Sequence, residues 1–447
     1  MEPKKIYCSE EEKMIERVIN VRNMQEACIH VMRNKGSAGV DGMRVTALSE
    51  FVRENKTKIA QALKYGDYKV QPILGVSIPK SNGKKRLLGI PTVLDRWLQQ
   101  CVAQAITPKF EFDFKPYSYG FRPGKNAHQC VQQSQRYIND RLNHIVDIDL
   151  KNFFDEVDHC ILLQLLYRKV KCKTTLRLIR QWLRAPILIE GKLVKRRKGV
   201  PQGSPLSPLL SNIMLHELDR QLEKRNCKYV RYADDFSIYC ENHSQAKRIG
   251  NDVYLFLKNK LKLPINREKS GIRNPSSFKL LGYNFVPTYK KGEKGKYQLV
   301  ASEGSWKELK EKIRTITRKT APLSIGERIQ QLKTVQRGWL EYFRLGSLIG
   351  KLGTLDSWVR NRLRYCIWKD WKKPERKRRN LMRLGVDYHH AYAWSRTRKG
   401  GWAVAQSPIL ITTITLKRLA QRGYESMLDH YKKIRPEQTF MGHSFTP

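Results

Sequence analysis

The chain has 447 residues, enough to bury two or three hydrophobic cores, and its 86 Lys+Arg against 41 Asp+Glu give a formal charge of +45 at pH 7. This excess favours a polyanionic partner, nucleic acid before an anionic membrane surface, and 40% hydrophobic with 10% aromatic residues excludes a basic disordered tail. No apolar run reaches the length of a transmembrane helix, and residues 1–22 are too charged for a signal peptide. The nine cysteines include no C-x-x-C pair and therefore support neither a disulfide framework nor a zinc site. We therefore expect a cytoplasmic protein with no membrane partner.

The N-terminal segment predicts a helix followed by a loop. Apolar residues recur at helical spacing from Glu10 to Met32. Residues 33–42 then combine three glycines with basic residues, which predicts a mobile loop. Such a loop could lie on a phosphate backbone, and a plain connection between helices explains the composition equally well.

Residues 78–91 predict a β-hairpin with Asn82-Gly83 at its turn. Its cations Lys80 and Arg86 flank that turn on opposite strands. They could converge on one triphosphate, Lys80 as a point charge and Arg86 as a planar fork. An exposed hairpin with solubilising charges is the alternative.

The next predicted strand, within residues 144–155, carries acidic residues on one face. Alternation places Asp147 and Asp149 on one side of the strand, and Ile148 and Leu150 on the other. Because burying an unpaired charge is expensive, a carboxylate row on an otherwise apolar strand needs a partner.

Three segments lead from this strand to the next acidic one. A helix is predicted over residues 159–184 and a hairpin over 187–194. The loop 199–208 is dense in proline and glycine, which fixes its backbone and exposes Gln202, a side chain with both donors and an acceptor. Residues 206–222 predict a helix that belongs to the structural core.

Two adjacent carboxylates lie at the tip of the next predicted hairpin. β-branched and aromatic residues flank Tyr232-Ala233-Asp234-Asp235 on both sides, which predicts strand, turn and strand. Like charges this close repel each other unless a cation or proton lies between them, and Mg²⁺ takes one or two carboxylates. A solvated turn is the alternative for this pair alone. If Asp149 lies beside the hairpin, the three carboxylates could share two metal ions for phosphoryl or nucleotidyl transfer.

The composition changes after residue 300. Residues 301–447 contain 31 Lys+Arg against 12 Asp+Glu, and strand signals thin out after a strand pair at 277–285. Capping boxes at Ser305 and Ser324 predict the starts of two helices, and a third is predicted from 355 to 371.

These helices predict one basic face. In the second helix we place Arg328 on the surface, outside the apolar stripe, and the run 372–379 predicts a concentrated cationic surface. A basic helical bundle suits a nucleic-acid duplex held through its phosphates. A solvated basic face is the alternative.

Several of these segments together resemble a known family. Four of them, in this order and spacing, resemble the palm motifs of reverse transcriptases: Asp149–Asp155, Pro201–Pro208, Tyr232–Asp235 and Phe278–Tyr283. Five more resemble the bacterial group II intron reverse transcriptase/maturases: Arg33–Gly42, Leu88–Arg96, Tyr117–Pro123, Arg337–Phe343 and Cys366–Trp371. The resemblance covers nearly the whole chain.

The resemblance implies an α+β protein with the right-hand polymerase fold, in which an antiparallel-sheet palm and fingers are followed by an α-helical thumb/maturase domain. The implied domains are an N-terminal extension with the start of the fingers (1–75, including a template-covering loop at 33–42), fingers and palm (76–300), thumb/maturase (301–400) and a basic C-terminal extension (401–447). Relatives that cut DNA carry a Cys/His-rich endonuclease domain, and because no such cluster follows Trp371 we expect none here.

The resemblance also implies roles for individual residues, each at the position that matches a family motif. The metal-binding and catalytic residues are Asp149, Asp234 and Asp235, holding two Mg²⁺ ions. The nucleotide-binding residues are Lys80 and Arg86 on the triphosphate, Gln202 beside the incoming nucleotide and Phe154 as the gate against a ribose 2′-hydroxyl. The primer- and template-binding residues are Tyr232, Gly282, Tyr283, Arg33, Lys35 and Gly36.

The function implied is that of an RNA-directed DNA polymerase of a group II intron type retroelement, which extends a primer 3′-OH with dNTPs and binds intron RNA to assist splicing and mobility. Its expected partners are intron RNA, an RNA template, a DNA primer or target and dNTPs. We expect a monomer or homodimer in the bacterial cytoplasm, associated with the nucleoid as a ribonucleoprotein. Two alternatives stay open: an RNA-binding maturase whose polymerase activity is secondary, and a domesticated relative in DNA repair or defence.

Overall fold

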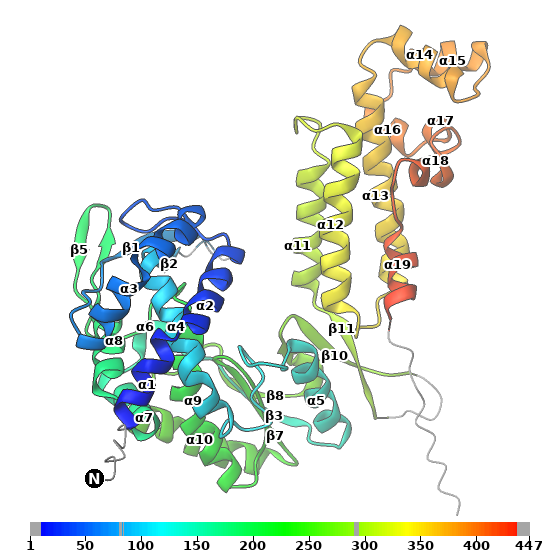
Figure 1. The fold of residues 1–447 in the computed structure, drawn as a ribbon. Helices are drawn as coiled ribbons and strands as arrows, with labels where there is room; N and C mark the ends of the chain where they lie inside the picture. Colours follow the sequence, from blue (N-terminus) through cyan, green and yellow to red (C-terminus); the bar gives the residue numbers. More distant parts are fainter. Residues whose placement is uncertain (1–9, 80–82, 84, 290–294, 436–447) are drawn as a thin grey trace, which may run out of the picture. The chain divides into compact units, whose positions relative to one another are not determined.

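Figure 1 shows the computed structural model, which describes residues 10–79, 83, 85–289 and 295–435, with side chains from residue 14 onward. The chain divides into two compact units, Met1–Asn274 and Pro275–Pro447. Helices and largely antiparallel strands occur in both, which confirms the predicted α+β class. Within the described ranges, no helix has the length and apolar character needed to cross a membrane.

The first unit begins with two helices, α1 (Glu10–Ile19) and α2 (Val21–Arg33), where we predicted one continuous helix. The chain breaks at Asn20, whose side-chain oxygen accepts hydrogen bonds from the amides of Arg22 at 3.0 Å and Asn23 at 3.4 Å. Asparagine is a favoured N-cap because it satisfies amides that have no partner inside the helix. The next helical elements are the 3₁₀ turn η1 (Val45–Ala47), α3 (Leu48–Tyr65) and α4 (Val93–Glu111).

The two strands of the predicted hairpin at 78–91 are confirmed as β1 (Ile73–Pro79) and β2 (Lys85–Ile90), which pair antiparallel, while Asn82 of the predicted turn lies outside the described residues. The hairpin predicted at 187–194 is confirmed as β4 (Ile187–Ile189) and β5 (Lys192–Val194), and β4 joins β1 in parallel. The resulting sheet, in the order β2-β1-β4-β5, is therefore mixed rather than wholly antiparallel.

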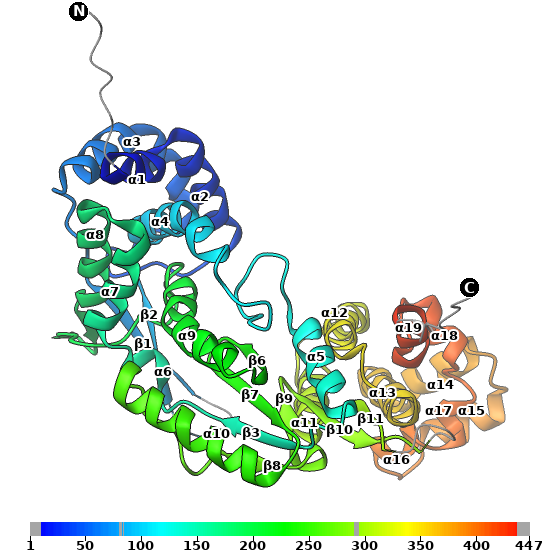
Figure 2. The same ribbon diagram turned by 90° about the horizontal axis from the view of Figure 1, so that it is seen from below.

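The predicted palm corresponds to a four-stranded antiparallel sheet in the order β6-β7-β3-β8. The central strand β3 carries Ile145, Val146 and Ile148 into the core, whereas Asp147 keeps part of its surface exposed. Figure 2 shows α10 lying along this sheet. The bounds are β3 (His144–Ile148), β6 (Lys228–Tyr232), β7 (Asp235–Cys240), β8 (Gly271–Arg273) and α10 (His243–Phe256), which continues as the π-helical turn η2 (Leu257–Leu261).

The helix predicted over 159–184 is in fact two helices, α7 (His159–Val170) and α8 (Lys173–Arg184). Lys171 adopts a left-handed conformation with φ 45°, which ends α7, and Cys172 caps α8. The helix predicted over 206–222 is confirmed as α9 (Ser207–Lys224), with a largely buried surface. The remaining helices of this unit are α5 (Ala127–Asn139) and the single turn α6 (Phe153–Glu156).

The second unit contains a small antiparallel sheet in the order β11-β10-β9, followed by helices. Its three long helices are α11 (Glu303–Ile316), α12 (Ile325–Phe343) and α13 (Ile349–Asp370). The strands are β9 (Lys279–Leu280), β10 (Tyr283–Pro287) and β11 (Tyr297–Ala301), after the 3₁₀ turn η3 (Pro275–Ser277). The later helices are α14 (Pro374–Arg383), α15 (Tyr388–Ser395), α16 (Gly401–Ala405), α17 (Pro408–Ile411), α18 (Leu416–Gln421) and α19 (Met427–Ile434).

The prediction that Arg328 lies on the surface of α12 is wrong. Its side chain is buried, and the guanidinium donates to four backbone carbonyls of the α11–α12 connection: those of Ile316 at 2.6 Å, Ala321 at 2.7 Å, Arg318 at 2.9 Å and Leu323 at 3.1 Å. Without Arg328, these carbonyl oxygens at the helix end and in the loop would lack a hydrogen-bond donor. The four hydrogen bonds therefore hold the α11–α12 connection in one conformation.

Candidate functional site

The β6–β7 hairpin ends in a tight turn, which we call the acidic tip (residues 232–235). Tyr232 pairs with Asp235, so Ala233 and Asp234 form a two-residue turn, and Ala233 has φ 57°. Backbone from another segment lies against this turn, because a Cβ on Gly120 would come within 2.3 Å of the Ala233 amide nitrogen. Because residue 120 is a glycine, its backbone can lie directly against the turn, and this contact fixes the position of the acidic tip.

The register of β3 against β7 brings a third carboxylate to the tip. Ile148 lies opposite Phe236, so one further step along each strand sets Asp149 opposite Asp235. The Asp149 carboxylate accepts a hydrogen bond from Asn266 Nδ2 at 2.9 Å, and Lys269 Nζ lies 3.7 Å away. The structure thus places the three aspartates predicted from the sequence at one end of one sheet.

Asp147 lies two residues before Asp149 on the same strand face, and it is the fourth member of what we call the carboxylate cluster (Asp147, Asp149, Asp234 and Asp235). Arg273 Nε on β8 donates to its carboxylate at 2.7 Å. Asp147 therefore already has a hydrogen-bonded cationic partner within the sheet, whereas the cation beside Asp149, Lys269, lies at the longer distance of 3.7 Å.

The electrostatics of the cluster favour a bound cation. Although Asp235 is exposed, loss of hydration beside the surrounding protein, together with repulsion from Asp234, Asp149 and Asp147, raises its pKa to about 6. Burial also raises the pKa of Asp234, and repulsion from Asp149 adds to this effect. Neighbouring carboxylates repel each other when they are charged, and a cation that lies between them removes this repulsion.

The same residues fit a divalent metal ion in a particular way. Across the described residues, no three His, Cys, Asp or Glu side chains converge closely enough to form a ready-made metal cage. Mg²⁺ does not require one, because it commonly binds one or two carboxylates and completes its octahedron with water and substrate phosphates. The cluster therefore suits an ion that arrives together with a nucleotide.

Two of the predicted nucleotide-binding residues contact each other beside the tip. Arg86 Nε on β2 donates to Gln202 Oε1, and the Gly89 amide donates to the Gln202 carbonyl oxygen at 2.9 Å. Arg86 also acts to lower the pKa of Asp234, against the effect of burial. The structure thus brings together a guanidinium, an amide and the acidic tip, while Lys80 lies outside the described residues.

Phe154 lies on α6, next to the segment that carries Gln202. The Val200 amide donates to the Phe154 carbonyl oxygen at 2.6 Å, two residues before Gln202. The Phe154 ring is half-buried, and it packs edge-on against Phe153 with 5.4 Å between ring centroids. Its backbone is therefore held by the loop that presents Gln202.

Sequence reasoning missed the residues that support the acidic tip, which we call the Arg231 cluster (Arg231, Asp219 and Asn212). Arg231 and Asp219 have fully buried side chains and form two hydrogen bonds, Nε to Oδ1 at 2.8 Å and Nη2 to Oδ2 at 2.6 Å. Arg231 Nη1 donates at 3.0 Å both to Asn212 Oδ1 and to the Ala233 carbonyl oxygen in the tip. The one available signal was the spacing of Asp219 and Asn212, seven residues apart on one face of the α9 helix.

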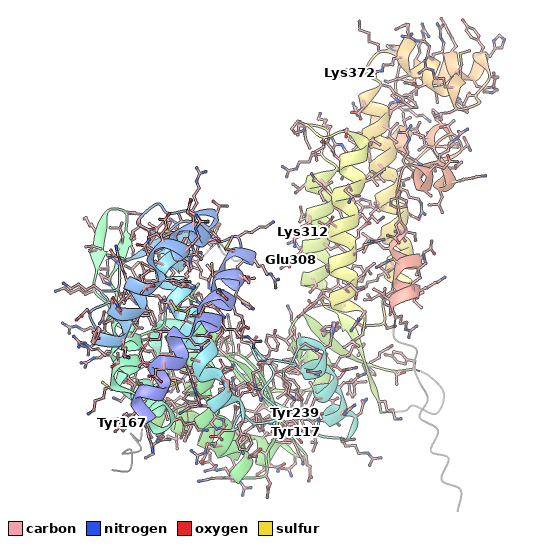
Figure 3. The ribbon with its side chains drawn as sticks, viewed as in Figure 1. Tyr117, Tyr167, Tyr239, Glu308, Lys312 and Lys372 are labelled. Atoms are coloured by element: carbon pink, nitrogen blue, oxygen red, sulfur yellow. The ribbon has the colours of Figure 1, made fainter. Side chains whose placement is uncertain are left out.

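A layer of aromatic side chains lies near the base of the same hairpin. The Tyr239 hydroxyl donates to Ser134 Oγ on α5 at 2.6 Å, and Figure 3 marks Tyr239 and Tyr117. The ring of Tyr137 lies 5.2 Å from the ring of Tyr239 and 6.0 Å from the ring of Tyr117. The backbone of Tyr117 accepts from the Arg231 amide at 2.9 Å. This layer supports the strands from which the acidic tip projects.

The loop 33–42, which we predicted to be mobile, packs on the beginning of α4. Arg96 Nη2 donates to the Ser37 carbonyl oxygen at 2.6 Å, and a Cβ on Gly39 would come within 2.6 Å of Thr92 Cα. Of the predicted template contacts, Gly36 lies against the Arg96 guanidinium, whereas Arg33 and Lys35 are exposed.

The other predicted primer contacts differ in exposure. Tyr232 is half-buried, with its ring 6.5 Å from that of Phe121. Tyr283, in the second unit, is fully buried: its hydroxyl donates to the Tyr342 carbonyl oxygen, and its ring lies 5.0 Å from Phe343. Gly282 precedes it with φ 83°, next to the ring of Phe343. The Tyr283 side chain therefore has no exposed surface in this structure, whereas the predicted role of the segment in primer binding stays a prediction.

Comparison with known proteins gives two family matches. Residues 78–285 match the reverse transcriptase (RNA-dependent DNA polymerase) family, and residues 306–385 match the group II intron maturase-specific domain. Protein YkfC of Escherichia coli is 30% identical over 304 residues, covering 59% of this chain and 80% of that protein. The group II intron-encoded protein LtrA of Lactococcus lactis is 32% identical over 317 residues, covering 56% of this chain and 53% of LtrA.

Among solved structures, a Cas6-RT-Cas1–Cas2 complex matches 55% of this chain and 43% of the matched chain, at 24% identity and a TM-score of 0.36. The chain thus spans most of YkfC but only about half the length of LtrA.

Proposed function

The chain belongs to the group II intron reverse transcriptase/maturase family, and we propose that it extends the 3′-OH of a primer with dNTPs on an RNA template. One observation above all supports this proposal: the β3–β7 register sets Asp149 opposite Asp235, so that three carboxylates lie at one end of the sheet. Two-metal nucleotidyl transfer requires such a group of acidic ligands.

We assign Asp149, Asp234 and Asp235 as the residues that hold two Mg²⁺ ions. When bound, these ions lower the pKa of the attacking hydroxyl and neutralise the charge that develops on the phosphate oxygens. The chain itself contributes the position of the ligands. Asn266 holds one oxygen of Asp149, and Arg231 holds the backbone of the turn that carries Asp234. Both contacts favour a single orientation of the carboxylates before substrate arrives.

For the nucleotide, we assign Arg86 to the triphosphate and Gln202 to the neighbourhood of the incoming base and sugar. The Arg86 guanidinium donates to the side-chain oxygen of Gln202, which orients the guanidinium, and it lies close enough to Asp234 to lower the pKa of that carboxyl. Phe154 is proposed as the group that excludes a ribose 2′-hydroxyl. Lys80 is proposed as a second triphosphate contact from its place in the sequence, since it lies outside the described residues.

For the primer and template, the structure supports a division of roles. Tyr232 at the acidic tip is proposed to position the primer end, and the exposed Arg33 and Lys35 are proposed to contact template phosphates. Gly36 allows Arg96 to approach the loop. In the second unit we propose that the backbone at Gly282 contacts the primer, and that the buried Tyr283 holds this turn against α12 through Tyr342.

The maturase-specific domain match at 306–385 favours a second, compatible role in binding intron RNA and assisting its splicing and mobility. The second unit carries exposed basic residues along α14, which suits a phosphate backbone. On this proposal the partners are intron RNA, an RNA template, a DNA primer and dNTPs.

Primer extension on an RNA template with Mg²⁺ and dNTPs tests the proposal. Wild-type protein should synthesise cDNA, and Asp234→Ala should reduce synthesis by more than about a hundredfold, since the loss of a residue that only hydrogen-bonds to a metal ligand already costs about 10–100-fold. RNA affinity should stay close to that of wild type, because Asp234 is not a cation. Full activity in Asp234→Ala, or no activity in the wild type, would contradict the proposal.

A further inference from the structure

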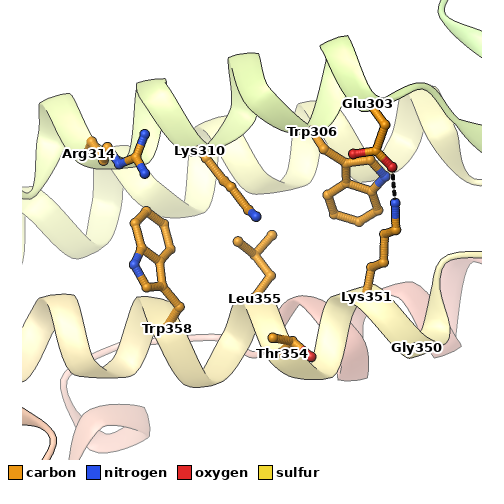
Figure 4. Close-up of a pocket in the computed structure, with 9 residues that line it drawn as sticks. All are labelled: Glu303, Trp306, Lys310, Arg314, Gly350, Lys351, Thr354, Leu355 and Trp358. Carbon is orange, nitrogen blue, oxygen red and sulfur yellow. Dashed lines mark hydrogen bonds and ion pairs between the residues drawn. The ribbon is translucent and has the colours of Figure 1, made fainter.

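A cavity of about 410 Å³ lies between α11 and α13 in the second unit. Figure 4 shows its walls: Trp306, Lys310 and Arg314 come from α11, at intervals of one helical turn, and Lys351, Leu355 and Trp358 come from α13. We call it the α11–α13 pocket. Its volume is in the range of cavities that hold one small ligand.

The lining combines an aromatic platform with an excess of positive charge. Trp358 is half-buried, and the guanidinium groups of Arg314 and Arg362 lie 5.7 Å and 5.9 Å from its ring centroid. Trp306 is buried, and its ring packs 4.5 Å from that of Trp339, so it forms an apolar wall. Leu355 on α13 is buried and also lines the pocket. Three cations and one carboxylate, Glu303, complete the lining.

The cations are available to an anionic ligand. In Figure 4 the Lys310 ammonium lies between the two tryptophans, and in the part of the chain that the structure describes no carboxylate forms an ion pair with it. Lys351 pairs with Glu303, and Arg314 with Glu311, but both pairs are solvent-exposed. Exposed pairs contribute little, so either cation can exchange its carboxylate for a phosphate.

We propose that the α11–α13 pocket binds one unpaired nucleotide of an RNA, with its base stacked on Trp358 and its phosphate on Lys310 and Arg314. Stacking on an aromatic ring together with cationic contacts to the backbone is how proteins bind unpaired nucleotides. A paired duplex presents its phosphates on the outside and needs no cavity. This inference rests on the proposed function, in which the second unit binds RNA, and adds a recognition site for an extruded base.

Two glycines of α13 provide a matched pair of variants. Gly350 lines the pocket, whereas Gly353 on the same helix does not, and at both positions an added Cβ would meet no atom within 4 Å. Gly350→Leu should therefore occupy pocket space without disturbing the neighbouring packing. Gly353→Leu makes the same chemical change outside the pocket.

Photocrosslinking provides the readout. The probe is an RNA hairpin with 5-iodouridine as a single-nucleotide bulge, compared with the same hairpin carrying that residue in a base pair. Wild-type protein and Gly353→Leu should crosslink the bulged probe at Trp358, located by mass spectrometry of the digested adduct. The crosslinking yield of Gly350→Leu at Trp358 should be at least about tenfold lower, which corresponds to a loss of about 1.4 kcal/mol in binding free energy. Equal yields in the two variants, or crosslinks only at other residues, would overturn the proposal.

A second pair of variants covers the case in which Gly350→Leu fails to fold. Lys310→Glu should reduce the Trp358 crosslink, whereas Lys312→Glu, an equal charge change on an exposed position of α11 outside the pocket, should reduce it much less. Equal reductions would overturn the proposal. Primer extension by the wild-type protein is measured in parallel, so that failure of the polymerase proposal, with crosslinking intact, is distinguished from failure of the pocket.

Discussion

In each unit a fully buried arginine holds an irregular piece of backbone, and the two arginines, Arg231 and Arg328, differ in their partners. Arg231 in the first unit is bound by the carboxylate of Asp219 and also donates to the carbonyl of Ala233 in the acidic tip. Among the described residues of the second unit, the hydrogen-bond partners of Arg328 are carbonyl oxygens of the α11–α12 connection. The first arrangement contains two buried charges that depend on each other, whereas the second contains one charge solvated by dipoles.

The difference indicates what each arginine is for. A buried ion pair is seldom the most stable solution at its position, because desolvating two charges costs about as much as their attraction returns. Its retention beneath the acidic tip fits a role in orienting Asp234. The cation also acts to lower the pKa of Asp234, which favours the charged form that binds metal. Arg328 has no such neighbour and serves the local fold.

The largest expected effect comes from breaking the ion pair. Arg231→Met leaves the Asp219 carboxylate buried without its partner, so we expect the free energy of unfolding to fall by about 3–5 kcal/mol. cDNA synthesis per folded molecule should also fall, because the Ala233 carbonyl loses its donor. Urea unfolding and primer extension measure the two quantities.

The double variant Arg231→Met/Asp219→Leu separates stability from function. Replacing both charges by apolar groups should restore most of the lost stability, since neither charge is then left unpaired. Activity should stay low. Recovery of activity together with stability would show that Arg231 supports folding and has no part in positioning the tip.

Arg328→Met should have a smaller effect on stability, about 2–3 kcal/mol, because the groups left behind are neutral carbonyls. Seven of the nine tryptophans lie in the second unit, so the unfolding of that unit dominates the change in tryptophan fluorescence. The KM for dNTPs should be unchanged in molecules that remain folded. A loss as large as that of Arg231→Met would remove the distinction between the two arginines.

Arg86→Gln should raise the KM for dNTPs by about tenfold or more, because a hydrogen bond to a charged group contributes about 1.5–3 kcal/mol. Lys85→Gln is the matched control, since its side chain points to the other side of β2. The two variants remove the same charge from neighbouring positions. Equal KM values for both would contradict a specific contact between Arg86 and the triphosphate.

Phe154→Val should lower the preference for dNTPs over rNTPs by about tenfold, a typical value for steric discrimination in a pocket. The ratio of kcat/KM values for dCTP and CTP measures it. Phe154→Tyr keeps the ring and should keep the preference. An unchanged ratio in Phe154→Val would assign the discrimination to another residue.

Sequence patterns predicted most of the strands, and they predicted that Asp149 lies near the acidic tip, because alternation along a strand and the chemistry of a two-residue turn are local properties. The ends of the helices were harder to predict from the sequence. The breaks at Asn20 and Lys171 each depend on one residue that leaves the helical conformation. The apolar residues on both sides keep their helical spacing, so the sequence pattern does not show the break.

The buried arginines were the feature hardest to predict from the sequence. Arginine is a surface residue in most contexts, so neither Arg231 nor Arg328 stands out until its partners are known. Asp219 lies 12 positions before Arg231, and the carbonyls around Arg328 belong to a loop without a sequence signature. Tyr283 is similar: its motif was visible, but its burial against Phe343 depends on contacts 60 residues along the chain.

Metal dependence of single-nucleotide addition tests the central claim most directly. Asp235→Asn removes one charge with almost no change of shape, and Asp140→Asn makes the same change at an exposed position at the end of α5. Both proteins are measured on a primed RNA template over a range of Mg²⁺ concentrations. We predict that Asp235→Asn is slower than Asp140→Asn by more than about a hundredfold at every concentration, with unchanged affinity for the primed template. Equal rates and equal Mg²⁺ dependence in the two variants would contradict the assignment of the acidic tip as the metal site.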